Sequence, residues 1–145
     1  MVVNHIKSKA QFEAAVRKYR VVVVEGCAEL SILSRLMAAF NRRMSREHPK
    51  AYYLNFDVDQ VPEIRHALKM RTTPSYTIFR DGLRVGDIVG LNPRGLEMTI
   101  AAALVGIETP SPSFAFTNYP SVKAPGSKKK TLSNYQSPKF TAVQT

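Results

Sequence analysis

Four consecutive β-branched residues, Val21 to Val24, constrain the fold of this chain more than any other feature. Such a run is typical of a strand buried on both sides, because a strand with one side in solvent alternates apolar and polar residues. Strand-like and helix-like patterns alternate on either side of the run. The sequence therefore predicts an α/β fold with a mixed central sheet flanked by helices on both faces.

The patterns in the first half of the chain predict two strands and two helices. A short first strand is expected at residues 2–6, and Ser8 with Gln11 forms a capping-box pattern that opens a helix. The strand at residues 21–24 is followed by a helix from Ser31 to about residue 48. In this second helix the apolar residues that recur at helical spacing are Leu33, Leu36, Met37, Phe40 and Met44.

The second half predicts a strand, a short helix, a hairpin and a last helix. The strand is expected at residues 52–58, with Asp59 as the N-cap of a helix that ends near Met70. Asp81-Gly82 is a strong hairpin signal between strands, and Asn92-Pro93 caps the last helix. The predicted order is β-α-β-α-β-α-β-β-α.

Composition divides the chain of 145 residues into two parts. All 11 acidic residues lie at or before Glu108, together with 16 of the 21 basic residues, so this part has a net charge of +5. The residues that follow hold five lysines, no acid and five of the nine prolines. We predict a compact domain at residues 1–107 and a basic, extended tail at residues 108–145. The net charge of +10 favours acidic partners.

The sequence holds one cysteine, Cys27, which excludes an internal disulfide and argues against a disulfide-rich secreted fold. No run approaches the roughly 18 apolar residues of a membrane span. The N-terminus lacks the apolar core of a signal peptide. We expect a cytoplasmic protein, with the cytoskeleton or a ciliary axoneme as the more specific location.

Several short motifs, taken in order, resemble those of the thioredoxin family over roughly residues 2 to 105. Ser31-Ile32-Leu33-Ser34 falls on the family's Cys-Gly-Pro-Cys motif, and Thr73-Pro74-Ser75 falls on its cis-proline loop. The other matching segments are Val21 to Glu25, Ala28-Glu29-Leu30, Phe56-Asp57-Val58-Asp59, Phe79-Arg80-Asp81-Gly82 and Val89-Gly90. The resemblance implies a thioredoxin-like sheet with a cis bond before Pro74.

The resemblance also implies that the family's chemistry is altered. Thioredoxin chemistry needs a thiolate at a helix N-terminus and a second thiol to resolve the mixed disulfide. Ser31 and Ser34 stand at both of these positions. We therefore predict that dithiol exchange is absent, that Ser31, Ser34 and Pro74 are degenerate site positions, and that the chain is not an enzyme.

Cys27 and Glu25, which lie near these positions in the sequence, each have more than one interpretation. Cys27 is read as a small buried apolar residue, with a reactive single thiol as the alternative. Glu25 matches a buried proton acceptor of related enzymes and is expected here as a buried acid paired with a lysine or a hydroxyl. The three histidines and the cysteine show no metal-ligand spacing, so we expect neither a metal nor a cofactor.

Two sets of residues are candidates for binding a partner. Arg42, Arg43 and Arg46 form a basic cluster late in the second helix, which is either a solvated helix face or a docking surface for an acidic partner. The tail carries spaced aromatic residues and lysines that we expect to anchor it. These tail residues are Phe114, Phe116, Tyr119, Lys123, Lys128, Lys129, Lys130, Tyr135, Lys139 and Phe140.

These features predict a redox-inactive thioredoxin-like structural or adaptor subunit of a large assembly. We expect the assembly to be microtubule-based, such as an axoneme, because tubulin is acidic and repetitive, with the tail lying along partner proteins. One alternative is a ribonucleoprotein subunit with Lys128 to Lys130 on phosphate, although the domain offers no clear stacking platform for RNA. A second alternative is a monothiol redox or chaperone-like protein that uses Cys27 or the groove beside Pro74.

Overall fold

The computed structural model describes residues 3–107 of the chain. Its helices and strands follow the predicted order and include a five-stranded sheet. The elements are β1 (Val3–His5), α1 (Lys9–Lys18), β2 (Val21–Cys27), α2 (Ile32–Glu47), β3 (Tyr52–Asp57), α3 (Pro62–Leu68), β4 (Ser75–Arg80), β5 (Leu83–Val89) and α4 (Pro93–Ala103). The predictions that concern the tail lie outside the described residues.

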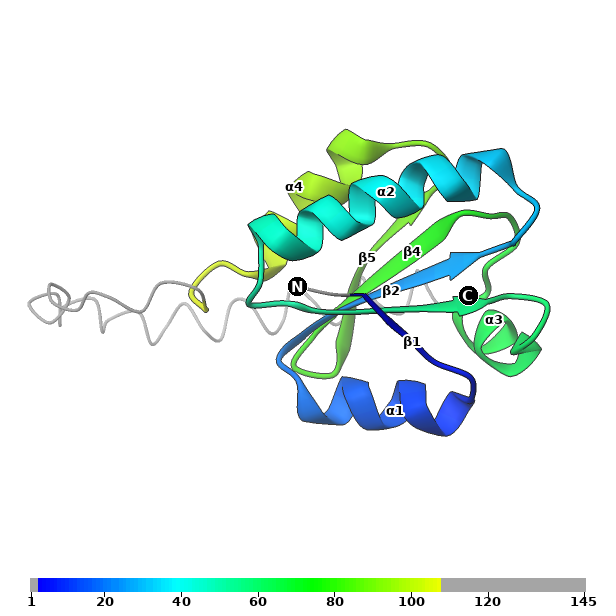
Figure 1. Ribbon diagram of the computed structural model, residues 1–145. Coiled ribbons are helices and arrows are strands. Elements are labelled where there is room, and N and C mark those ends of the chain that lie inside the picture. Colours follow the sequence, from blue (N-terminus) through cyan, green and yellow to red (C-terminus); the bar gives the residue numbers. More distant parts are fainter. Residues whose placement is uncertain (1–2, 108–145) are drawn as a thin grey trace, which may run out of the picture. The chain divides into compact units, whose positions relative to one another are not determined.

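The sheet is mixed, with the strand order β1-β3-β2-β4-β5. β1, β3 and β2 run parallel, whereas β4 pairs antiparallel with both β2 and β5. Figure 1 shows α1 and α3 on one face of the sheet and α2 and α4 on the other. The predicted mixed sheet covered on both faces is therefore confirmed.

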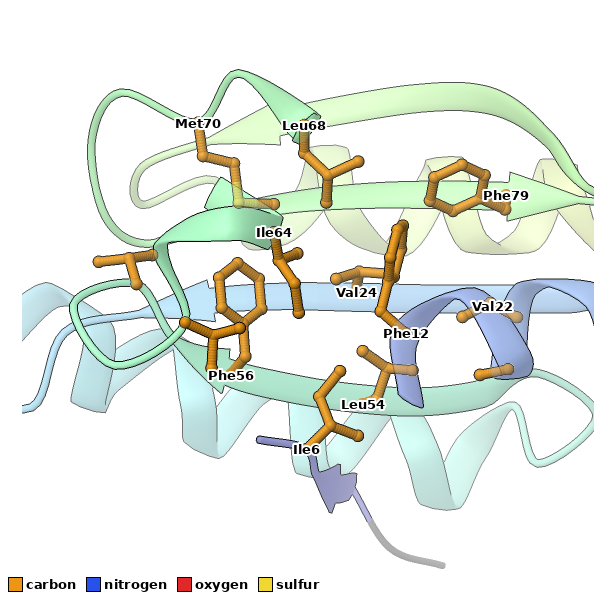
Figure 2. Close-up of a cluster of buried hydrophobic side chains, with 13 residues drawn as sticks. Ile6, Phe12, Val22, Val24, Leu54, Phe56, Ile64, Leu68, Met70 and Phe79 are labelled. Carbon is orange, nitrogen blue, oxygen red and sulfur yellow. The ribbon is translucent and has the colours of Figure 1, made fainter. Parts of the chain in front are cut away.

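β2 lies at the centre of the sheet, and its four valines have no exposed surface. On one face, Val22 and Val24 join a cluster of buried side chains from α1, β3, α3 and β4 (Figure 2). Phe12 of α1 meets Phe79 of β4 edge-on, with ring centroids 5.7 Å apart. The β-branched run thus forms the centre of the core, as the sequence predicts.

The β4–β5 hairpin turns at Asp81 and Gly82, which both have positive φ angles, 52° and 83°. Two consecutive residues of this kind form the tight turn that matches the twist of a hairpin, and Asp-Gly favours it. The Asp81 carboxylate accepts hydrogen bonds at 2.9 and 3.2 Å from Arg20, which precedes β2. The ion pair holds the pKa of Asp81 below its ordinary value, the hydrogen bond from Arg20 being the main cause.

The start and end of α3 differ from the prediction. Asp59 is not the N-cap, since that position is Val61, which has no side-chain cap. Instead, the Asp57 carboxylate accepts from the backbone N–H groups of Asp59 and Gln60, at 2.8 and 3.2 Å, and closes the turn before the helix. The helix ends at Leu68 because Lys69 adopts a left-handed backbone conformation. Across residues 3–107, no helix is long and apolar enough to cross a membrane.

Candidate functional site

The residues singled out by the sequence meet at the edge of the sheet where β2 ends. Gly26 of β2 pairs with Ser75 of β4, and Ser75 pairs with Val89 of β5. The loop that follows β2, the Pro74 loop and the turn after β5 therefore lie next to one another at this edge.

The peptide bond between Thr73 and Pro74 is cis, as the resemblance implies. The Pro74 carbonyl accepts a hydrogen bond at 2.8 Å from the N–H of Gly90, which has a φ angle of 77°. The Ser75 hydroxyl donates to the Thr72 carbonyl at 2.6 Å. These bonds fix the Pro74 loop against the turn that ends β5.

Ser31 and Ser34 both bond to the backbone at the start of α2. Ser31 is the N-cap, and its hydroxyl oxygen accepts at 3.1 Å from the N–H of Ser34. The hydroxyl oxygen of Ser34, a buried residue, accepts at 3.2 Å from the N–H of Ala28. The two serines thus satisfy N–H groups that would otherwise lack partners at a helix start and in the loop before it.

Cys27 is half-buried at the end of β2. Its thiol donates to the Phe56 carbonyl at 3.4 Å. Burial raises the pKa of this thiol to about 12, and the charges of Glu25 and Asp57 add to the effect. The Cys27 thiol is therefore almost entirely protonated near neutral pH.

Glu25 is buried beneath α2, two residues before the end of β2. Tyr76, directly opposite on β4, donates its hydroxyl to one carboxylate oxygen at 2.6 Å, and Asn41 of α2 donates to the other at 3.3 Å. The predicted pairing with a hydroxyl is thereby confirmed. Burial raises the pKa of Glu25 above its ordinary value of 4.5, against the opposing effect of these hydrogen bonds.

Apolar side chains surround this edge of the sheet, and several are exposed. Leu30 and Ile32, in and after the loop that follows β2, are 87% and 71% exposed. Val89 and Leu91, on either side of Gly90, are 63% and 55% exposed. We call Leu30, Ile32, Val89 and Leu91 the rim surface, while Pro74, in the neighbouring loop, is buried. Sequence reasoning noted that this region has changed, but it did not predict that the side chains would face solvent.

The basic cluster is exposed on α2, as both of its interpretations require. Arg43 donates to the Glu47 carboxylate at 2.9 Å and lies over the ring of Phe40, 5.5 Å from its centroid. Sequence reasoning missed a neighbouring group, in which Glu47, His48 and Glu97 bring possible metal-ligand atoms within 4.8 Å of one another. Glu47 is at the same time paired with Arg43, so its carboxylate is already engaged.

No family model matches the chain. Among curated proteins, it is 26% identical over 101 residues to thioredoxin-1 of Saccharomyces cerevisiae, covering 70% of this chain and 98% of the relative. It is 29% identical over 102 residues to thioredoxin-2 of Pyricularia oryzae, covering 70% of this chain and 60% of that longer relative.

Solved structures show the same fold. Mitochondrial thioredoxin 3 from Saccharomyces cerevisiae, in its oxidised form, superposes with a TM-score of 0.67 at 21% identity, covering 69% of this chain and 94% of that one. Plasmodium falciparum thioredoxin gives a TM-score of 0.66 at 24% identity, over 69% and 98% of the two chains. The chain has the thioredoxin fold, and its sequence is similar to those of thioredoxins. Its thioredoxin fold is the one that the motifs predicted.

The similarity to named thioredoxins overturns one prediction. We expected the chain not to be an enzyme, and this was wrong, because its relatives are named thioredoxins, which are redox oxidoreductases and point to enzyme activity. That prediction was based on the serines at positions 31 and 34. It did not take sufficient account of the similarity to thioredoxins over the rest of the domain. Since the sequence holds one cysteine, thiol chemistry within this chain would involve Cys27.

Proposed function

We propose that this thioredoxin-fold domain binds extended polypeptide segments at the rim surface. The observation that supports the proposal best is the exposure of four large apolar side chains on two loops at one sheet edge. Exposed apolar surface of this kind, rimmed by polar residues, is typical of binding sites. The Pro74 loop lies between the two apolar loops, because β4 lies between β2 and β5.

The spacing of the two loops suits a single peptide strand. Neighbouring strands are about 4.8 Å apart, so two loops separated by one strand lie roughly 10 Å apart. That distance equals about three residues of an extended chain. A bound segment could therefore place one apolar side chain against Leu30 and Ile32 and another against Val89 and Leu91.

Replacing Leu30 and Leu91 with serine tests this proposal. Reduced and alkylated insulin B chain serves as the probe, with binding to the full chain measured by fluorescence anisotropy. Burying a leucine contributes about 1.5–3 kcal/mol, so the double variant is expected to bind at least about tenfold more weakly. Leu83→Ser is the matched control, because Leu83 is also exposed, at 47%, but lies in the hairpin at the other end of β5. Equal affinities for the double variant and the unchanged chain would contradict the proposal.

A second candidate function, thiol chemistry at Cys27, is favoured by the named relatives, and it has its own test. Alkylation by iodoacetamide requires the thiolate, and the pKa of Cys27 is raised to about 12. We expect the rate constant in the folded chain to rise about tenfold per pH unit from pH 7 to 10. At pH 7 it should lie far below that of the unfolded chain, whose thiol has a pKa of about 8.5. Rapid alkylation at pH 7 would instead identify Cys27 as an activated thiol.

At the level of assembly, we propose that the chain is an adaptor for an acidic protein polymer such as the microtubule. The net charge of +10 and the exposed arginines of α2 support this proposal. The relatives support the family and not this role. Co-sedimentation with microtubules should be strong at low salt and weaken as salt rises. Binding to RNA without binding to microtubules would favour the ribonucleoprotein alternative.

A further inference from the structure

The outer face of α2 carries a row of apolar side chains. Leu33, Leu36 and Phe40 follow the spacing i, i+3, i+7, which places them along one side of a helix. Leu33 is 42% exposed, Leu36 is 55% exposed, and Phe40 is partly exposed. α2 lies beside α4 on one face of the sheet (Figure 1), and this row is not enclosed by that contact.

The buried side of α2 is unusually polar, whereas a helix usually turns its most apolar side toward the core. Ser34, Asn41 and Ser45 are buried there, together with Met37 and Met44. Asn41 donates to Glu25, and Ser45 donates to the Arg42 carbonyl at 2.7 Å. The domain core therefore uses only two of the large apolar residues of α2. In the sequence, Leu33, Leu36 and Phe40 belong to the same periodic set as Met37 and Met44. Only the two methionines are buried, so packing in the core does not explain why the other three positions are apolar.

A row of arginines runs beside the apolar row. Arg35, Arg42 and Arg46 are exposed and follow the spacing i, i+7, i+11. Within residues 3–107 none of the three forms an ion pair, whereas Arg43 is paired with Glu47. Ala39 lies between the two rows, as does Arg43 one turn later, so close approach of a partner helix is possible beside Ala39 and is limited beside Arg43. We call these six residues and Ala39, without Arg43, the α2 outer face.

We propose that the α2 outer face docks an amphipathic helix of a partner protein, with apolar side chains on one side flanked by Asp or Glu. Its apolar row would cover Leu33, Leu36 and the part of Phe40 that Arg43 leaves exposed, and its acidic residues would pair with Arg35, Arg42 and Arg46. From Leu33 to Arg46 the face is about 20 Å long, which corresponds to a partner helix of roughly 13–14 residues. This proposal does not depend on peptide binding at the rim surface.

Charge excludes the occupants that this chain could itself supply. The residues after Glu108 carry five lysines and no acid, so they would be repelled by the arginine row. A second copy would place arginines against arginines. Nucleic acid lacks aliphatic side chains to cover Leu33 and Leu36, and the only ring here, Phe40, lies beneath Arg43 and offers no open stacking platform. An amphipathic helix with an apolar row and an acidic row can cover the apolar side chains and pair with the arginines.

Selection from a display library of randomised helical peptides tests the proposal, with the full chain as bait. Counter-selection against R35Q/R42Q/R46Q removes peptides that bind elsewhere on this basic chain. We expect enriched peptides to combine apolar residues at i, i+3 or i+4 and i+7 with a flanking row of Asp or Glu. Their affinity should fall at least tenfold in R35Q/R42Q/R46Q and in Leu36→Ser. It should stay within twofold in K7Q/R17Q/R71Q, which removes the same charge from exposed positions outside α2.

Four outcomes of the peptide selection would overturn the proposal. The first is that no peptide is enriched over the starting library, and the second is that the enriched peptides lack either the apolar or the acidic row. The third is that K7Q/R17Q/R71Q weakens binding as much as R35Q/R42Q/R46Q does. The fourth is that Leu36→Ser leaves the affinity unchanged. Vesicles containing an anionic phospholipid are assayed in parallel. If they bind with the same dependence on Arg35, Arg42 and Arg46 while no helical peptide does, the face binds membranes and the proposal is wrong.

Discussion

Glu25→Gln is expected to stabilise the domain at neutral and alkaline pH relative to the unchanged chain. The Glu25 carboxylate is buried, and burial raises its pKa above the ordinary value of 4.5. Asn41 Oδ1, close by, is buried and has no hydrogen-bond partner among the described residues. Glutamine would keep the acceptor for the Tyr76 hydroxyl and add an amide that can donate to Asn41. It would also remove the cost of ionising a buried acid.

The sign of the pH dependence follows from proton linkage. Below the unfolded pKa both states of the unchanged chain hold the proton, and the contribution of Glu25 to stability is fully present. As pH rises from about 4.5 toward the raised pKa of the folded state, only the folded state keeps the proton. The free energy of unfolding then falls by up to about 1.4 kcal/mol per pH unit. In Glu25→Gln this fall in the free energy of unfolding with rising pH should be absent.

Urea unfolding between pH 4 and pH 9 measures the effect. The other ionisable groups near Glu25 are Tyr76 on β4, Cys27 on β2 and Arg42 on α2. The pKa values of Tyr76 and Cys27 are both raised, chiefly by burial, so neither group accounts for a change of stability between pH 4 and pH 9. Glu29→Gln is the matched control at an exposed acid and should leave the pH profile unchanged. A Glu25→Gln profile parallel to that of the unchanged chain would show that Glu25 has an ordinary pKa.

Phe56→Ala is expected to cause the largest loss of stability of any single substitution discussed. Phe56 lies on β3 with no exposed surface, in the cluster of Figure 2. Removing a buried phenylalanine side chain costs about 3–5 kcal/mol, because the cavity collapses only in part. For a domain of about 100 residues this should lower Tm by more than about 12 °C. Thermal unfolding followed by circular dichroism measures the change.

Leu83→Ala is the control for Phe56→Ala, because Leu83 also lies in a strand but is 47% exposed. Its effect should stay within about 0.5 kcal/mol. A similar small effect for Phe56→Ala would mean that the cluster on this face of the sheet is not tightly packed.

Local signals accounted for most of the fold. The β-branched run predicted the buried central strand, and Asp81-Gly82 predicted the hairpin because few residue pairs adopt two positive φ angles. Asn92 was expected to cap α4 and does so, since its side chain accepts from the N–H of Gly95 at 2.9 Å. The N-cap of α3 was mistaken because Asp57 and Asp59 both offer a carboxylate near the same turn.

Features that depend on tertiary contacts could not be predicted in the same way. The hydrogen bond between Tyr76 and Glu25 joins residues 51 positions apart, and only the register of β4 against β2 brings them together. The exposure of Leu36 depends on how α2 rotates on the sheet, and the buried hydrogen bonds of Ser34 and Asn41 favour that rotation. Periodicity alone gives no information about which of two partly apolar faces turns inward.

Backbone amide NMR of the full chain, titrated with reduced and alkylated insulin B chain, tests polypeptide binding at the rim surface most directly. The predicted result is a set of saturable shift changes centred on Leu30, Ile32, Ser75, Val89, Gly90 and Leu91, lost in the variant with Leu30→Ser and Leu91→Ser. Saturable changes confined to other surfaces, or none at millimolar peptide, would contradict the proposed function.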